Sequence, residues 1–107
     1  MTDSRVIRMA EIEIDPRALD DYKRLLAEEI DLSLEREPGV LQLEAASLRD
    51  APHLFRLLEV YASPEAYQAH LKTEHFLAYK AATAAMVVSL RLIEADALRI
   101  GNSSRKS

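Results

Sequence analysis

Residues 57–79 read LLEVYASPEAYQAHLKTEHFLAY and contain the signals for one strand and two helix starts. The first part of this stretch belongs to a run over residues 53–62 that is apolar on both faces except for Arg56 and Glu59. A short apolar run that ends at a turn is typical of a largely buried β-strand. The stretch therefore begins with a predicted strand that carries one isolated glutamate.

Helices are predicted to follow this strand. Ser63 and Pro64 form a helix start, since serine caps free backbone N–H groups and proline suits the first turn. The spacing predicts a short helix over residues 64–71. Thr73 breaks that helix and caps an alanine-rich helix over residues 74–86.

The N-terminal part predicts a strand over residues 6–14 and a helix that starts at Asp15 and Pro16 and runs to residue 35 or 36. One face of the strand is apolar, and the helix carries an apolar stripe at spacings of three and four residues. Proline and a glycine that tolerates positive φ end the helix at residues 38–39. The strand face consists of Ala10, Ile12 and Ile14, and the helix stripe of Leu19, Tyr22, Leu26, Ile30 and Leu34.

Two further strands complete the pattern. Residues 40–48 alternate apolar and polar side chains, and a turn at residues 49–52 joins them to the strand over 53–62, which predicts an antiparallel hairpin. Residues 88–95 predict the last strand. Residues 1–98 are expected to form one domain, and residues 99–107 a flexible tail.

The order β-α-β-β-α(α)-β, with short connections and right-handed crossovers, predicts a ferredoxin-like α+β sandwich with an antiparallel four-stranded sheet. Its helices would cover one sheet face only. The other face still carries apolar residues, and a chain of 107 residues is too short to cover both faces. We therefore expect a homodimer that packs through this sheet face.

Composition excludes several functions. The chain has no cysteine, which excludes disulfides, thiolate metal sites and cysteine nucleophiles. Its net charge of −4 and the absence of a Lys/Arg-Gly-Phe run give no sign of nucleic-acid binding, although RNA-recognition modules share this element order. With two glycines, it has no phosphate-cradling loop. No signal peptide or membrane-length apolar run occurs, so the expected location is cytoplasmic, without membrane contact.

Glu59, His70 and His75 are the candidate catalytic residues. Glu59 lies mid-strand among apolar residues and would be a buried carboxyl able to act as a base, or else a structural partner of a sheet arginine. His70 is expected near a helix C-terminus, which favours its protonated form, and His75 near an N-terminus, which favours the neutral form. Such a pair can transfer protons; the alternative is that one histidine is a surface residue and the other a satisfied helix-end histidine.

A substrate pocket would be lined by aromatic residues, for which plain core packing is the alternative. A metal site formed by His70, Glu74 and His75 is the weaker interpretation, because these residues straddle a helix break and lack the i, i+4 spacing of a helical histidine pair. We therefore predict no metal. The candidate substrate-binding residues are Tyr22, Tyr61, Phe76 and Tyr79.

The stretch from Leu57 to Tyr79 resembles the antibiotic-biosynthesis-monooxygenase family. The pattern is a strand glutamate two residues before an aromatic, a helix that reaches a histidine, and a second histidine followed by an aromatic. The corresponding residues here are Glu59, Tyr61, His70, His75 and Phe76, and the turn at residues 37–39 is also similar. The resemblance covers roughly residues 5–95 and implies a dimeric α+β barrel.

The family includes quinol monooxygenases, polyketide-tailoring oxygenases, haem-degrading enzymes and an autoinducer-2-processing enzyme that catalyses an isomerisation; the histidine segment looks most like that last branch. Haem-degrading members place a tryptophan at the position of His70, a ligating histidine near Lys80 and an asparagine near Ile12. Because all three differ here, haem cleavage is not expected.

The resemblance implies an enzyme that needs no bound cofactor. A base would take a proton from a small hydroxylated aromatic, quinol or keto compound, and the anion would react with oxygen or be reprotonated elsewhere. We expect His75 to be the base or acid, His70 its partner, and Glu59 an orienting group or alternative base. The alternative is a non-catalytic dimeric module that binds a small apolar ligand.

Overall fold

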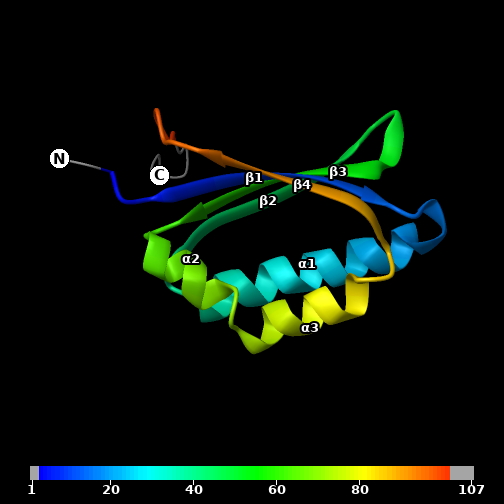
Figure 1. Cartoon of the computed structure of the whole chain (residues 1–107), viewed down its shortest axis with the longest axis horizontal. Helices are drawn as coiled ribbons and strands as arrows, with labels where there is room; N and C mark the ends of the chain where they lie inside the picture. Colours follow the sequence, from blue (N-terminus) through cyan, green and yellow to red (C-terminus); the bar gives the residue numbers. More distant parts are fainter. Residues whose placement is uncertain (1–2, 102–107) are drawn as a thin grey trace, which may run out of the picture.

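The computed structural model describes residues 3–101 and has the predicted element order (Figure 1). A single 3-10 turn, η1, precedes the first α-helix, and α2 and α3 follow the hairpin directly. The elements are β1 Val6–Ile14, η1 Pro16–Ala18, α1 Leu19–Arg36, β2 Val40–Leu48, β3 Ala51–Tyr61, α2 Pro64–His70, α3 Glu74–Thr83 and β4 Val87–Ala95.

The sheet has the order β2-β3-β1-β4, and every neighbouring pair is antiparallel. In the register, Ala10 of β1 lies opposite Leu57 of β3 and Leu92 of β4. The helices lie on one face of the sheet, with α1 and α3 side by side (Figure 1). This is the predicted ferredoxin-like α+β arrangement.

The core lies between α1 and the two central strands. Ala10, Ile12 and Ile14 are buried, as the alternation in β1 predicts. Tyr22 of α1 packs edge-to-face against Phe55 of β3, with ring centroids 5.0 Å apart. Burial of these side chains fixes the helix layer on the sheet.

Several element ends differ from the predicted ones. Strand β3 starts at Ala51, which pairs with Leu48, so the turn is shorter than predicted and Pro52 lies within the strand. Helix α3 ends at Thr83 and not at residue 86. The Met86 N–H bonds the Thr83 carbonyl, and the Met86 carbonyl accepts a bond from the Asp15 N–H, so this segment ties α3 to the start of the first helical turn.

The predicted apolar stripe of α1 is wrong in its last turns. Leu34 is 44% exposed, whereas Glu29 and Ser33 are buried at 7% and 0%. The buried positions 22, 26, 29 and 33 are spaced four, three and four residues apart, so they lie on one face of an α-helix with 3.6 residues per turn. Polar residues therefore occupy the sheet-facing positions in the second half of α1.

Gly39 has a different role from the predicted one. No glycine in the described residues has a positive φ. A Cβ at Gly39 would instead lie 2.6 Å from the Cβ of Ala66 in α2, which is closer than real contacts. The glycine therefore allows α2 to pack tightly against the start of β2.

The sheet face opposite the helices is uncovered in a single chain (Figure 1). It carries Met9, which is 38% exposed and pairs with Ile93, and also Glu11, which forms ion pairs with Arg56 and Arg91. Packing of a second copy on this face stays a prediction. No helix in the described residues is long and apolar enough to cross a membrane. Residues 102–107 of the predicted tail lie outside the described residues.

Candidate functional site

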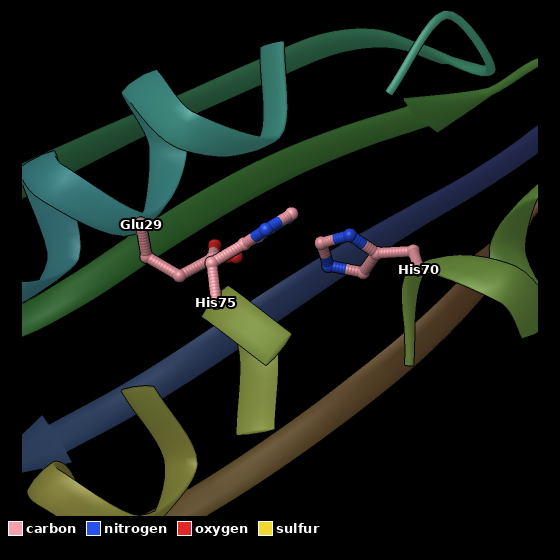
Figure 2. Close-up of side chains that lie close together, drawn as sticks. All are labelled: Glu29, His70 and His75. Atoms are coloured by element: carbon pink, nitrogen blue, oxygen red, sulfur yellow. The ribbon is translucent and has the colours of Figure 1, made fainter. Parts of the chain in front are cut away.

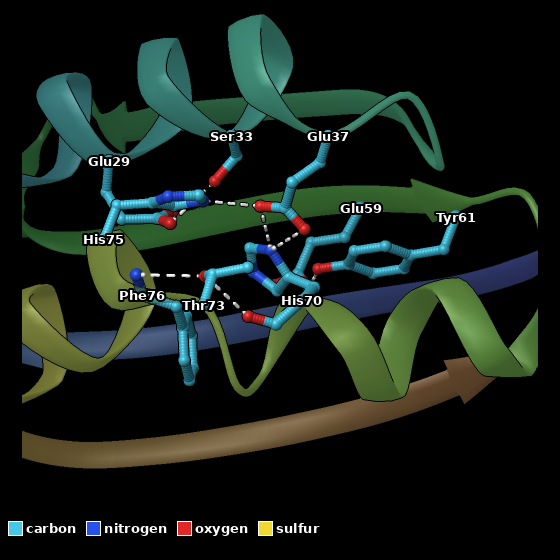
Figure 3. A network of polar contacts seen from close by, with 9 residues as sticks. All are labelled: Glu29, Ser33, Glu37, Glu59, Tyr61, His70, Thr73, His75 and Phe76. Atoms are coloured by element: carbon cyan, nitrogen blue, oxygen red, sulfur yellow. Dashed lines mark hydrogen bonds and ion pairs between the residues drawn. The ribbon is translucent and has the colours of Figure 1, made fainter.

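Two buried histidines and a glutamate come together where three helices end or begin (Figure 3). His70 is the last residue of α2, His75 lies in the first turn of α3, and Glu37 caps the C-terminus of α1. The histidines are only 3% and 9% exposed. The helix layer therefore brings residues that are more than 30 positions apart into one cluster.

The Glu37 carboxylate bridges both imidazoles. Its Oε2 lies 3.0 Å from His70 Nδ1 and 2.5 Å from His75 Nε2. A carboxylate only accepts hydrogen bonds, so we assign each of these two ring nitrogens as a donor. That assignment leaves the opposite nitrogen of each ring with a lone pair when the imidazole is neutral.

The break between α2 and α3 is held by Thr73. Its hydroxyl donates to the His70 carbonyl at 2.8 Å and accepts from the Phe76 N–H at 3.2 Å, as the predicted cap requires. One side chain thus satisfies both helix ends. It also fixes the orientation of His70 relative to His75.

Glu29 and Ser33 extend the cluster along α1. The Ser33 hydroxyl donates to Glu29 Oε1 at 2.7 Å. Burial raises the pKa of the Glu29 carboxyl, and the Ser33 hydrogen bond opposes that rise. One ligand atom each of Glu29, His70 and His75 lie within 4.8 Å of one another, and Figure 2 shows the three side chains converging.

A cavity of about 370 Å³ lies between the sheet and the helices. Its wall is mostly apolar, from strands β1, β3 and β4 and from α1 and α3. Its polar and aromatic lining includes Glu29, Glu59, Tyr67, His70, Phe76 and Tyr79. An apolar cavity with a few convergent polar groups is the usual form of a small-molecule site.

Glu59 and His70 line this cavity, whereas His75 does not. Glu59 accepts a 2.7 Å hydrogen bond from the Tyr61 hydroxyl, and within residues 3–101 it forms no ion pair with an arginine. His75 lies behind the wall and reaches His70 through Glu37. The pair therefore has one member that a ligand can touch and one that supports it.

Of the four aromatic residues predicted to bind substrate, two line the cavity and two lie outside it. Phe76 and Tyr79 line the cavity, whereas Tyr22 and Tyr61 are fully buried and do not. Tyr22 shares a 2.7 Å hydrogen bond with the Tyr79 hydroxyl. Burial raises the pKa of all three tyrosines among these four, so their phenols are hydrogen-bonding groups at neutral pH.

Sequence reasoning missed Glu37, Glu29 and Ser33 as site residues. In the sequence pattern Glu37 belongs only to the turn at residues 37–39, and the predicted apolar stripe, which ends at Leu34, gives no sign that Glu29 is buried. The usable signal was the i, i+4 spacing of Glu29, Ser33 and Glu37 on one helix face. Glu74, the third member of the weaker metal hypothesis, is exposed and is not in the cluster.

Residues 5–82 match the family model described as antibiotic biosynthesis monooxygenase. The chain belongs to this family. The matched range is most of the 107 residues and contains Glu37, His70 and His75. No curated protein matches the chain.

Solved structures of related proteins share the fold. A candidate antibiotic biosynthesis monooxygenase from Bacteroides thetaiotaomicron is 41% identical, with a TM-score of 0.89 over 94% of this chain and 95% of that one. A candidate monooxygenase from Lactobacillus acidophilus is 29% identical, with a TM-score of 0.85 over 86% of this chain and 44% of that one. A Caulobacter crescentus protein, at 20% identity and a TM-score of 0.85, covers 92% of this chain and 93% of its own and supports the fold alone.

Proposed function

We propose that this family member is an enzyme that needs no organic cofactor and takes a proton from a small hydroxylated aromatic, quinol or keto compound in the apolar cavity. The observation that carries the proposal is the Glu37 carboxylate, which holds His70 Nδ1 at 3.0 Å while His70 lines the cavity. Family membership supports both an oxygenase reaction and this substrate class, and the apolar cavity with an adjacent histidine suits them.

His70 is the better candidate for the base, in place of His75. With Nδ1–H donated to Glu37, the neutral ring presents its Nε2 lone pair on the side away from the carboxylate. Glu37 stabilises the imidazolium that forms when His70 accepts a proton, as a buried carboxylate does in other histidine bases. His75 donates to the same carboxylate and keeps it in place.

The reaction begins with transfer of a substrate O–H or activated C–H proton to His70. The substrate anion then either reacts with dioxygen or is reprotonated at another carbon. In the first case, a methylene or aromatic C–H becomes a carbonyl, the substrate supplies four electrons, and the second oxygen atom leaves as water. The largely apolar wall excludes water, which strengthens the attraction between the substrate anion and the imidazolium.

Oxygen uptake and product formation with a panel of quinols, hydroxylated aromatics and hydroxy-ketones test the proposal. His70→Ala should lower kcat/KM by about 10²–10⁴-fold, the usual share of a general base. His75→Ala should cost less, because it acts through Glu37. The matched control is His53→Ala, a histidine of β3 outside the cluster, which should retain wild-type activity.

Product formation without oxygen uptake would identify an isomerase and keep His70 as the base. A His70→Ala variant with wild-type turnover would contradict the assignment. Retention of ligand affinity with no turnover on any class in the panel would instead support the non-catalytic ligand-binding module.

A further inference from the structure

Beyond this proposed reaction, we propose that Glu29, His70 and His75 form a binding site for a divalent transition-metal ion of the zinc type. The three residues come from α1, α2 and α3. All are more than nine-tenths buried, with exposed fractions of 7%, 3% and 9%. One ligand atom of each lies within 4.8 Å of the others (Figure 2). Zinc bonds of about 2.0–2.2 Å place ligand atoms roughly 3–4 Å apart, so a small contraction of side chains closes the site.

The chemistry of the three ligands defines the ion. Two imidazoles and one carboxylate are the protein ligands of several catalytic zinc sites and of non-haem iron sites, both of which keep an open coordination position. Hard ions such as Mg²⁺ and Ca²⁺ prefer oxygen ligands and are not expected here. The chain has no cysteine, so no thiolate competes for the ion.

The surrounding residues already provide an outer shell. Glu37 accepts from His70 Nδ1 and His75 Nε2, which leaves His70 Nε2 and His75 Nδ1 for an ion. Metal-binding histidines commonly donate their second ring N–H to a carboxylate in this way. Ser33 holds Glu29 through a 2.7 Å hydrogen bond, which orients the third ligand.

Charge and access also favour a dication. The cluster contains the carboxyl groups of Glu29 and Glu37, and within the described residues neither forms an ion pair with a lysine or an arginine; Glu37 contacts the two histidines. A divalent ion bound by neutral imidazoles would balance both carboxylates without protonating either ring. Glu29 and His70 line the cavity, so an ion has a route of entry and a ligand can reach its open position.

Metal binding is measured directly, so its result does not depend on the proposed reaction. The full chain, stripped with a chelator, is titrated with Zn²⁺ in equilibrium dialysis and with Co²⁺ while the visible spectrum is recorded. We expect one equivalent to bind, with the intense Co²⁺ bands of a four- or five-coordinate site. Because the ion takes the His70 nitrogen that the proposed base needs, loading should also suppress turnover.

Variants separate the site from surface binding. Glu37→Gln removes an outer-shell partner and should weaken binding by about 10–100-fold. Glu29→Gln and His75→Ala remove ligands and should weaken it more. His53→Ala is the matched control and should bind like the wild type. Retention of wild-type affinity in Glu29→Gln and His75→Ala would overturn the proposal.

A second measurement needs no variant, so it tests the site even if the variants fail to fold. In wild-type protein with ¹⁵N-labelled histidine, Zn²⁺ should shift the ring nitrogens of two of the three histidines and leave His53 unchanged. Absence of any stoichiometric binding, or a shift confined to His53, would show that the cluster is a hydrogen-bonded network and not a metal site.

Discussion

The two halves of α1 face the same sheet with opposite chemistry. In the first half, Tyr22 and Leu26 are buried against the apolar core. In the second half, Glu29 and Ser33 occupy the equivalent positions, and Glu37 follows at the helix end. The apolar half supplies packing that holds the layers together, whereas the polar half buries groups that stabilise the fold less and can do chemistry.

The polar half can be buried because its groups are satisfied. Among the described residues, no fully buried side-chain nitrogen or oxygen lacks a hydrogen-bond partner. An unpartnered buried polar group costs about 1–3 kcal/mol, so a cluster of this size would otherwise consume much of a small domain's stability. Full satisfaction makes the cluster close to neutral for stability and leaves it available for function.

The largest expected effect on stability lies in the apolar half. Phe55→Ala removes the ring that packs on Tyr22 and leaves a cavity, so the free energy of unfolding should fall by about 3–5 kcal/mol. Urea denaturation followed by circular dichroism measures it. His53→Ala, two residues earlier on the same strand, is the control and should cost much less. A loss below about 1 kcal/mol for Phe55→Ala would show that the core lies elsewhere.

Much of the fold could be predicted from the sequence, because local patterns decide it. The alternation in β1 places Ala10, Ile12 and Ile14 on the buried face, and the caps at Ser63 and Thr73 mark the starts of α2 and α3. Helix α3 is predicted too long, since residues 84–86 are alanine-rich and apolar but form a turn, closed by the local Met86–Thr83 bond and tied to Asp15 by a tertiary one. Propensity carries no information about such contacts.

The site was less predictable, because burial of Glu29 and Ser33 is a property of the assembled helix layer. An apolar stripe at helical spacing is the standard signal for a buried face, and here it pointed to Leu34. The two histidines were identified from their helix-end positions and the family resemblance, but the shared carboxylate was not. A contact over 33 or 38 residues leaves no local pattern in one sequence.

A smaller loss in the free energy of unfolding is expected where the polar half of α1 meets α2. Gly39→Ala forces a Cβ to within 2.6 Å of Ala66, which should cost about 1–3 kcal/mol and displace α2 with His70. Thermal and urea denaturation measure the stability. Because Glu37 lies two residues away, turnover should fall as well. Gly101→Ala is the matched control, since an added Cβ there meets nothing within 4 Å. Equal stability of the two variants would contradict the close approach.

A further effect of about 1 kcal/mol is expected at the boundary between the halves, where Tyr22 and Tyr79 share a 2.7 Å hydrogen bond. Tyr22→Phe and Tyr79→Phe should each destabilise the chain by that amount, because each leaves the other hydroxyl without this partner. The double variant should lose less than the sum of the two, since no hydroxyl is then left over. Additive losses in urea denaturation would show that the hydroxyls do not interact.

The smallest effect is a change in alkaline stability. Burial raises the pKa of Tyr22, so in the folded chain this phenol keeps its proton above pH 10, where the unfolded chain begins to release it. The unfolded state then binds fewer protons, and by linkage the free energy of unfolding falls as pH rises through about 10. Below that pH, the stabilisation that this tyrosine contributes to the folded chain is fully present. Tyr22→Phe removes the pH dependence that comes from this phenol. The free energy of unfolding of the variant should therefore decline less steeply than that of the wild type between about pH 9 and 10.5. Urea denaturation across that range measures both slopes, and parallel curves would mean that the Tyr22 phenol ionises as readily in the folded chain as in the unfolded one.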